Sequence, residues 1–186
     1  VQWLFEAKKR FETCILNYAV TSNHIHLLVK DGQEREVIPQ TMQLIAGRTG
    51  QEYNQRKNRK GAFWEDRYHC TMVEDGEHLW NCIQYTDLNM VRAGVVAHPH
   101  EWQWCGYREL MGEKPRYRLI DVARLLRLVG QPDLESFRAE YRQRIQHAIN
   151  EKKFSREKRW TESIAVGGEE FVKSIAVSIR RERIKP

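Results

Sequence analysis

The segment TSNHIHLLVK, residues 21–30, places two histidines directly ahead of a hydrophobic run. Side chains alternate across a β-strand, so His24 and His26 are expected on one face and Ile25 on the other. Two imidazoles about two residue rises apart can share one divalent ion. For an isolated pair of this spacing a structural or surface explanation is the more frequent one. A metal site therefore needs a third ligand from elsewhere in the chain.

The chain around this strand alternates helices and strands. Apolar periodicity and turn residues predict a helix over residues 3–11 and a hairpin with a polar turn over 13–31. They then predict a long helix over 37–58, a strand over 62–75 and a second long helix over 76–93. Gly94 is well suited to end the last of these helices. The order fits an α+β fold with a ferredoxin-like antiparallel sheet and helices on one side, but the first strand of that layout is missing. We favour an upstream segment outside this sequence as the explanation.

Composition indicates a globular protein outside the membrane. The chain has 186 residues, of which 41% are hydrophobic and 30% charged. No apolar run approaches the roughly 20 residues of a membrane helix, and no secretion signal is recognisable. The four cysteines form no CxxC pair, so we expect reduced thiols in a cytoplasmic protein.

Charge is distributed unevenly along the chain. Residues 1–113 carry 13 Lys and Arg against 15 Asp and Glu, whereas residues 114–186 carry 18 against 10. The composition changes near residue 114, so we predict a domain over 1–113 and a basic helical extension over 114–186. Within the first part, RKNRKGAFWEDR (residues 56–67) gathers basic residues. Such patches favour a polyanion, most often nucleic acid, although a solvated basic face explains a single patch equally well.

The helix predicted over 76–93 offers candidate chemistry. Tyr85 and Asn89 are four residues apart and therefore share one helical face. An Asn oxygen can bind Mg²⁺ or Mn²⁺, and two histidines with an amide oxygen suit Mn²⁺ better, with zinc left open. Tyr85 is then a phenol close to the metal, or alternatively a half-buried aromatic of an amphipathic helix.

Four segments taken together resemble one family. SNHIHLLV, GAFWEDRYHCTMVED, YTDLNMVRAGVV and WQWCGY resemble, in order and spacing, motifs of the REP-associated tyrosine transposases, within the HUH group of single-strand DNA endonucleases. The resemblance covers roughly residues 3–112. It implies His24 and His26 as metal ligands, Asn89 as the third ligand and Tyr85 as the nucleophile. Met90 stands where the family commonly has proline, which predicts a more regular helix at this point.

The resemblance also implies an activity. It is nicking and strand transfer of single-stranded or hairpin DNA through a 5′-phosphotyrosine, with Mg²⁺ or Mn²⁺ acting on the scissile phosphate. Basic residues would hold the DNA phosphates; the candidates are Arg48, Arg56, Lys57, Arg59, Lys60 and Arg67. Trp64 is a candidate for stacking on unpaired bases, while core packing is favoured for Trp102 and Trp104. We favour a monomer over a dimer.

Two other functions remain open. One is a non-catalytic protein that keeps the transposase fold and recognises DNA hairpins. The other is a metal-dependent hydrolase in which water attacks and Tyr85 is structural. The spacing of Tyr85 and Asn89 favours the transposase. We interpret His69 as a packed or partly exposed strand histidine and the pair His98 and His100 as structural.

Overall fold

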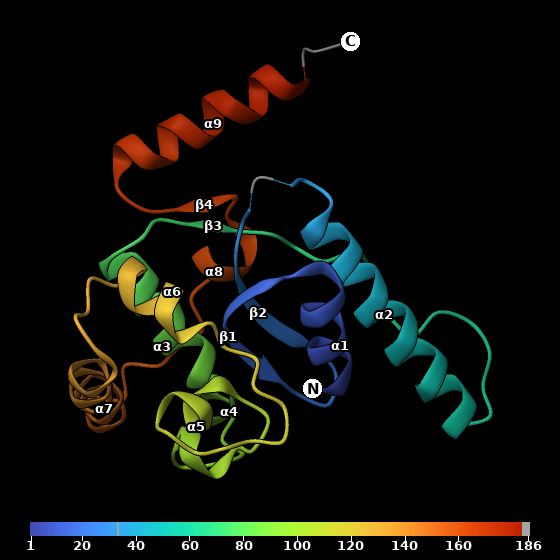
Figure 1. The fold of residues 1–186 in the computed structure, drawn as a ribbon, viewed down its shortest axis with the longest axis horizontal. Coiled ribbons are helices and arrows are strands. Elements are labelled where there is room, and N and C mark those ends of the chain that lie inside the picture. The colour runs from blue at the N-terminus through green and yellow to red at the C-terminus, as the bar shows by residue number, and fades with distance from the viewer. Residues whose placement is uncertain (33, 184–186) are drawn as a thin grey trace. The chain divides into compact units, whose positions relative to one another are not determined.

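The computed structural model describes residues 1–32 and 34–183, without the side chains of 181–183 (Figure 1). The chain forms two compact units, one of residues 1–68 with 86–125 and the other of residues 69–85 with 126–186. Helices and short strands occur in both, so the predicted α+β class is confirmed. No helix of the described residues is long and apolar enough to cross a membrane. The predicted boundary near residue 114 stays a prediction.

The first unit is built around a hairpin. Its complete elements are α1 (Gln2–Phe11), β1 (Cys14–Val20), β2 (Ile25–Lys30), α2 (Val37–Arg56), α4 (Asn89–Arg92), the 3-10 helix η1 (Pro99–Glu101) and α5 (Gly106–Leu110). The predicted first helix, hairpin and long helix are therefore confirmed. The strands pair antiparallel, with Tyr18 opposite Leu27 and Val20 opposite Ile25.

Strand β1 is the centre of this unit because both of its faces are buried. One edge of β1 pairs with β2, and irregular chain occupies the other edge of β1. The Val20 N–H donates to the Trp104 carbonyl, and the Ile15 carbonyl accepts from the Asp121 N–H, each over 2.8 Å. These bonds leave less of the strand edge open to another chain.

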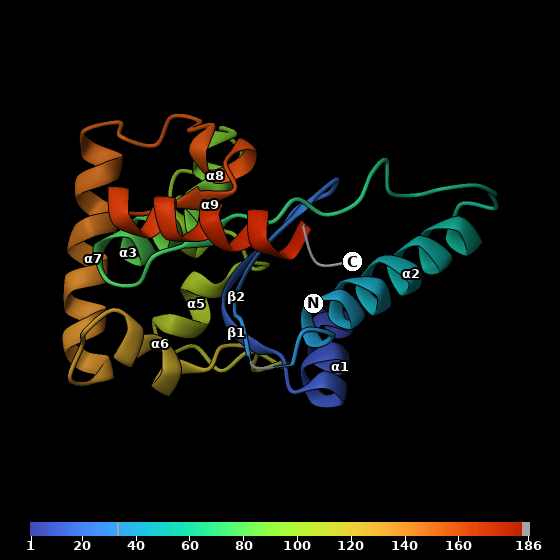
Figure 2. The ribbon, with the colours of Figure 1, turned by 90° about the horizontal axis from the view of Figure 1, so that it is seen from above.

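The sequence predicted helices on one side of the sheet, but in the structure helices flank the hairpin on both sides. Figure 2 shows α1 and α2 on one side of β1 and β2 and α5 on the other. The close approach of α5 depends on Gly106, where a β-carbon would collide with the side chains of Asn17 and Ile120. The absent side chain at this position lets α5 pack directly on β1.

The strand predicted over residues 62–75 is wrong for most of its length. Only β3 (Met72–Val73) is a strand, and it pairs in parallel with β4 (Ala165–Val166). Residues 65–70 are exposed and have no strand beside them among the described residues. The sheets described are thus two-stranded, β1 with β2 and β3 with β4, in place of one larger predicted sheet.

The second unit is mainly helical. It contains β3, β4, α7 (Leu134–Asn150), α8 (Arg159–Glu162) and α9 (Glu169–Arg183), and most of α3 (Glu77–Asp87); α6 (Val122–Leu128) crosses the division between the units. The region predicted to be a helical extension contains α6, α7, α8 and α9 among the described residues. The sequence did not predict α8 or β4.

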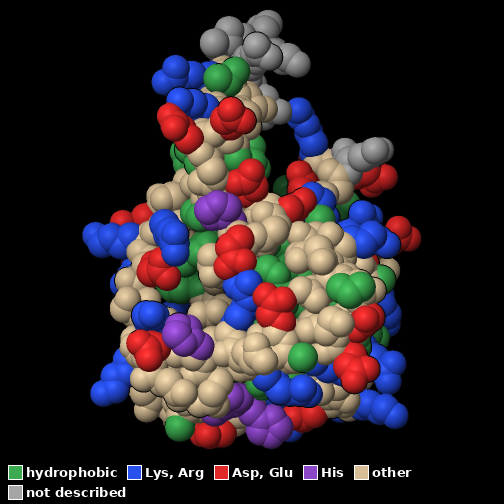
Figure 3. All heavy atoms as spheres, turned by 90° about the vertical axis from the view of Figure 1, so that its left-hand side faces the viewer, with side chains coloured by type: hydrophobic (Ala, Val, Ile, Leu, Met, Phe, Trp, Pro, Cys, Tyr) green, Lys and Arg blue, Asp and Glu red, His purple; other side chains and the backbone are tan. Residues whose placement is uncertain are grey.

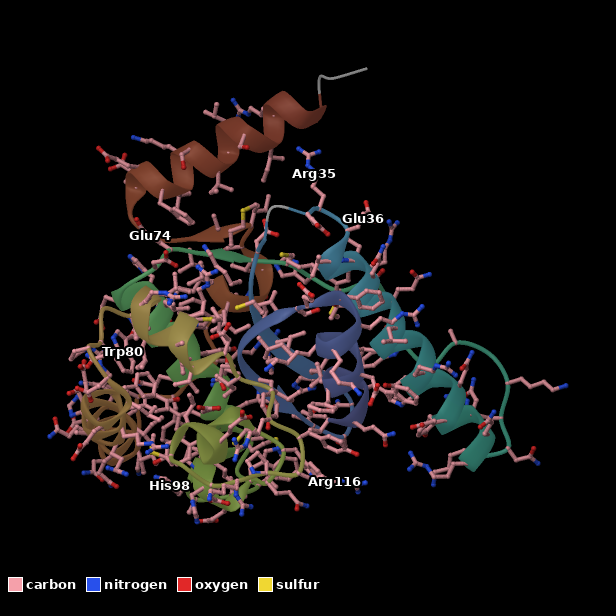
Figure 4. The ribbon with its side chains drawn as sticks, in the orientation of Figure 1. Arg35, Glu36, Glu74, Trp80, His98 and Arg116 are labelled. Carbon is pink, nitrogen blue, oxygen red and sulfur yellow. The ribbon has the colours of Figure 1, made fainter. Side chains whose placement is uncertain are left out.

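Aromatic stacking joins α3 to α7 in this unit. Trp80 is labelled in Figure 4. Its ring stacks on that of Phe137 with centroids 4.8 Å apart, and Tyr141 packs against both. The Arg144 guanidinium lies 4.8 Å from the Trp80 ring centroid. It also donates two hydrogen bonds to Glu77, of 2.7 and 2.8 Å. This arginine is thus held in place and is partly neutralised.

Charge is mixed on the face drawn in Figure 3. Lys and Arg side chains are interspersed there with Asp and Glu, and the described side chains form no continuous basic patch on it. The positive excess of residues 114–186 is therefore not gathered on this face.

Candidate metal centre and nucleic-acid site

The first unit brings together three side chains that the sequence singled out. His24 ends the hairpin turn and His26 lies in β2, with ring centroids 5.1 Å apart and planes at 88°. The Asn89 Nδ2 atom lies 2.8 Å from His26 Nε2. Asn89 is buried and is the first residue of α4. A hairpin and a helix far apart in the sequence thus contribute to one cluster.

The helix carrying Asn89 is interrupted, contrary to the prediction of a regular helix. Helix α3 ends at Asp87, Leu88 has φ −76° and ψ 3°, and α4 begins at the next residue. The break occurs even though residue 90 is methionine rather than proline. Met90 and Val91 are both buried, so their packing fixes the short α4. Gly94 ends this region with φ 69°, as predicted.

Both histidines are held in the neutral form. Burial lowers the pKa of His26 to about 4, with smaller contributions from neighbouring His24 and the Arg92 cation. Partial burial and then Arg92 lower the pKa of His24 as well. A neutral imidazole has the lone pair that a metal ion requires. Sequence reasoning missed Arg92, although it lies three residues after Asn89 and hence on the same side of α4.

These residues fit a divalent metal ion. Ligands at neighbouring positions of an octahedron with bonds of about 2.1 Å are about 3 Å apart. The 2.8 Å separation of His26 and Asn89 is close to that value. A half-turn of the amide presents its oxygen in place of the nitrogen. Within the described residues no three His, Cys, Asp or Glu side chains gather into a metal site, and a metal held by this histidine pair would need a further ligand such as the Asn89 oxygen.

The candidate nucleophile Tyr85 lies in the second unit, in a hydrophobic cluster. Its ring centroid is 5.8 Å from that of Trp160, and Val73, Cys82 and Val166 complete the cluster. Only 8% of Tyr85 is exposed. The structural alternative was a half-buried aromatic, and the ring is more buried than that; its role as nucleophile stays a prediction.

The six candidate DNA-binding residues are exposed side chains of the first unit. They lie on α2 and on the loop that follows it, at Arg48, Arg56, Lys57, Arg59, Lys60 and Arg67. The loop is ordered by its own contacts. Asn54 Nδ2 donates to the Gly61 carbonyl over 2.8 Å, and Arg59 donates to the Ala62 carbonyl over 2.9 Å. The Arg59 guanidinium also covers the ring of Tyr53.

A cavity of about 240 Å³ opens beside His24 in the same unit. Its walls come from the start of α1, the hairpin turn, α2 and the loop after it, and include Trp3, Phe63 and Trp64. Trp64 donates to the Ala46 carbonyl over 3.1 Å, which fixes its indole. The cavity thus offers aromatic walls next to one candidate metal ligand.

The remaining candidates have mostly structural roles. Trp102 donates to the Val20 carbonyl over 3.0 Å, as expected for a packed indole, whereas Trp104 is 44% exposed. His98 Nδ1 accepts the His100 N–H over 3.1 Å, which agrees with the structural interpretation of that pair. His69 Nε2 lies 3.2 Å from the Ser163 carbonyl oxygen in the second unit.

Comparison with known proteins identifies the class of the domain. Residues 2–87 match the family described as "Transposase IS200 like". This match contains both histidines and Tyr85, and Asn89 follows it by two residues. No match was found among curated proteins or among solved structures.

Residues 2–87 are therefore similar to a domain of the IS200-like transposases, in agreement with the resemblance found in the sequence. Transposases of this family are enzymes, and they typically use a divalent metal. The domain therefore indicates DNA binding and cleavage of single-stranded DNA in transposition.

Proposed function

We propose that this protein nicks single-stranded DNA next to hairpins and transfers the cut strand through a 5′-phosphotyrosine on Tyr85. The metal, Mg²⁺ or Mn²⁺, would be held by His24, His26 and Asn89. The observation that carries the proposal is the meeting of these three side chains, contributed by the hairpin and by α4. The fold we propose is that of the HUH nucleases, with the β1–β2 hairpin as part of a ferredoxin-like sheet.

The reaction exchanges one phosphoester for another. When bound, the metal supplies Lewis acidity that polarises a phosphate oxygen. The Tyr85 oxygen forms a bond to phosphorus while the bond from phosphorus to the 3′ oxygen breaks. The phenolic proton is lost and a proton is gained by the departing 3′ oxygen, so protons balance. Attack by another 3′-hydroxyl reverses these changes and rejoins DNA without ATP.

Access to Tyr85 is a condition of this mechanism. Its ring packs in the cluster with Trp160 and Val166 and 8% of the residue is exposed, so the mechanism would need a phosphate to gain access to its hydroxyl. The burial of Tyr85 also favours the second candidate function, a hairpin-binding protein that does not cleave.

Strand binding would use the basic loop and the cavity. The exposed cations on α2 and its loop can contact consecutive phosphates without reading sequence. The cavity beside His24 can take an unpaired base between its aromatic walls. A base in this cavity would bring its own phosphate close to His24, and Arg92 adds positive charge at the same place.

We also propose which part of the chain is catalytic and which oligomeric state is active. Catalysis would reside in residues 1–113, with residues 114–186 as a basic extension, and the active form would be a cytoplasmic monomer. Light scattering after size-exclusion chromatography, with and without a hairpin oligonucleotide, tests this form. A mass of two chains in the DNA-bound state would contradict it.

The decisive experiment looks for the covalent adduct. A labelled oligonucleotide with a hairpin and single-stranded flanks is incubated with the protein and Mn²⁺, then separated under denaturing conditions. We expect a protein–DNA adduct that Tyr85→Phe abolishes without loss of DNA binding. Tyr68→Phe, which changes an exposed tyrosine, is the control and keeps the adduct.

Each other outcome identifies a different function. Cleavage that survives Tyr85→Phe would indicate a hydrolase in which water attacks. Binding without cleavage in the unaltered protein would indicate the hairpin-binding protein. His26→Ala should abolish the adduct and leave hairpin affinity within a few-fold, since phosphate contacts come from α2 and its loop.

A further inference from the structure

The turn that precedes β2 is closed by an unusually dense set of hydrogen bonds. The Thr21 N–H donates to the His24 carbonyl over 3.0 Å. The Thr21 hydroxyl oxygen accepts the N–H groups of Asn23, over 3.4 Å, and of His24, over 3.1 Å. The same hydroxyl oxygen lies 2.9 Å from the His24 carbonyl oxygen and 3.2 Å from Asn23 Oδ1, so the hydroxyl donates towards these two acceptors. Thr21 thus fixes the backbone and one side chain of the turn.

The Asn23 side chain reaches the ring of the residue that follows it. Its Oδ1 atom lies 2.8 Å from His24 Nδ1. The orientation of the amide follows from Thr21, because both acceptor positions of that hydroxyl are already used by backbone N–H groups. A reversed amide would direct a further donor at the same oxygen. The atom facing His24 is therefore an oxygen, which can only accept.

This contact determines where His24 carries its proton. Since Asn23 Oδ1 only accepts, His24 Nδ1 has to bear the hydrogen. A neutral imidazole has one N–H, so Nε2 keeps the lone pair. Histidines that bind metals commonly donate their second ring N–H to an oxygen in this way, which fixes both tautomer and ring orientation.

We propose that Asn23 is a positioning residue that holds His24 in the Nδ1–H tautomer and directs Nε2 to the metal ion. The inference rests on the proposed metal site and extends it to a residue outside the ligand set. The exposed ring of His24 meets the ring of His26 edge to face, and its contact with Asn23 determines which ring nitrogen carries the hydrogen. Loss of such a partner oxygen typically weakens metal binding 10- to 100-fold.

The test uses the full chain and two independent readouts. The first is ¹⁵N NMR of histidine-labelled, metal-free protein, which distinguishes a ring nitrogen bearing hydrogen from one with a lone pair. The second is the Kd for Mn²⁺, measured by titration followed by electron paramagnetic resonance. The variants are Asn23→Ala and Asn23→Gly, which remove the acceptor, and Asn23→Asp, which keeps it. Ser22→Ala, at the neighbouring exposed position, is the control.

We expect the unaltered protein, Asn23→Asp and Ser22→Ala to show Nδ1–H at His24. The two acceptor-free variants should show the Nε2–H form or a mixture, and a Kd for Mn²⁺ raised 10- to 100-fold. Unchanged tautomer and Kd in the acceptor-free variants would overturn the role of Asn23 while leaving the metal site intact. If Asn23→Ala does not fold, Asn23→Gly replaces it in both measurements. Failure of the unaltered protein to bind Mn²⁺ would overturn the metal site and this inference together.

Discussion

His26 should make the stability of the protein fall as the solution becomes acidic. Its pKa is lowered from the ordinary 6.5 to about 4, mainly by burial. Below pH 6.5 the unfolded chain takes up a proton at this residue, whereas the folded chain does not until about pH 4. The folded state therefore loses stability over this interval and no further below it. With about 1.4 kcal/mol for each tenfold change in proton affinity, the loss amounts to about 3 kcal/mol.

Urea unfolding at a series of pH values between 7.5 and 4 measures this contribution. The variant His26→Gln keeps an amide where the ring was and has no proton to bind. We expect the free energy of unfolding of the unaltered protein to fall by about 3 kcal/mol more than that of the variant. His147→Gln, which changes an exposed histidine on α7, is the control and should follow the unaltered protein. A constant difference between the unaltered protein and His26→Gln across this range would refute the reasoning.

Three further substitutions test the packing. Gly106→Ala should lower the free energy of unfolding, measured by thermal melts, by about 1–3 kcal/mol, because the added β-carbon would collide with the side chains of Asn17 and Ile120. Gly47→Ala, with open space around it in α2, is the control and should be neutral or stabilising. Trp160→Ala should cost about 3–5 kcal/mol and make Tyr85 more reactive towards nitration, detected by mass spectrometry; unchanged nitration would argue against the hydrophobic cluster. Arg144→Ala should lower the free energy of unfolding by denaturant by about 1–2 kcal/mol, because it removes the ion pair with Glu77 and the contact with the Trp80 ring. A change within about 0.3 kcal/mol would mean that neither contact stabilises the fold.

Long periodic segments were predicted well because their pattern is local. The apolar spacing that predicted α1 and α2, and the helices of the C-terminal part, reflects which side of each helix meets a core. The polar turn between β1 and β2 was equally readable, since Thr21 and Asn23 form bonds with their own neighbours. The strand expected over 62–75 failed because strand formation needs a partner, and the sequence of a single segment does not supply one.

Some residues of the candidate site could be predicted from the sequence, and others could not. The histidine pair and Asn89 could be selected by residue type and spacing, with the family resemblance to join them. Asn23 and Arg92 were overlooked because their roles depend on distances across the turn and around α4. The neutral state of His26 was likewise unpredictable, since burial is produced by residues distant in sequence.

The sequence by itself determined most of the longer helices, the hairpin and the resemblance to a transposase domain, because each follows from a short pattern of side chains along the chain. Only the tertiary structure decided that His26 and Asn89 come within 2.8 Å of each other, and that Tyr85 is packed against Trp160. Contacts between residues 63 and 75 positions apart depend on how the intervening elements fold back, and no local pattern records that.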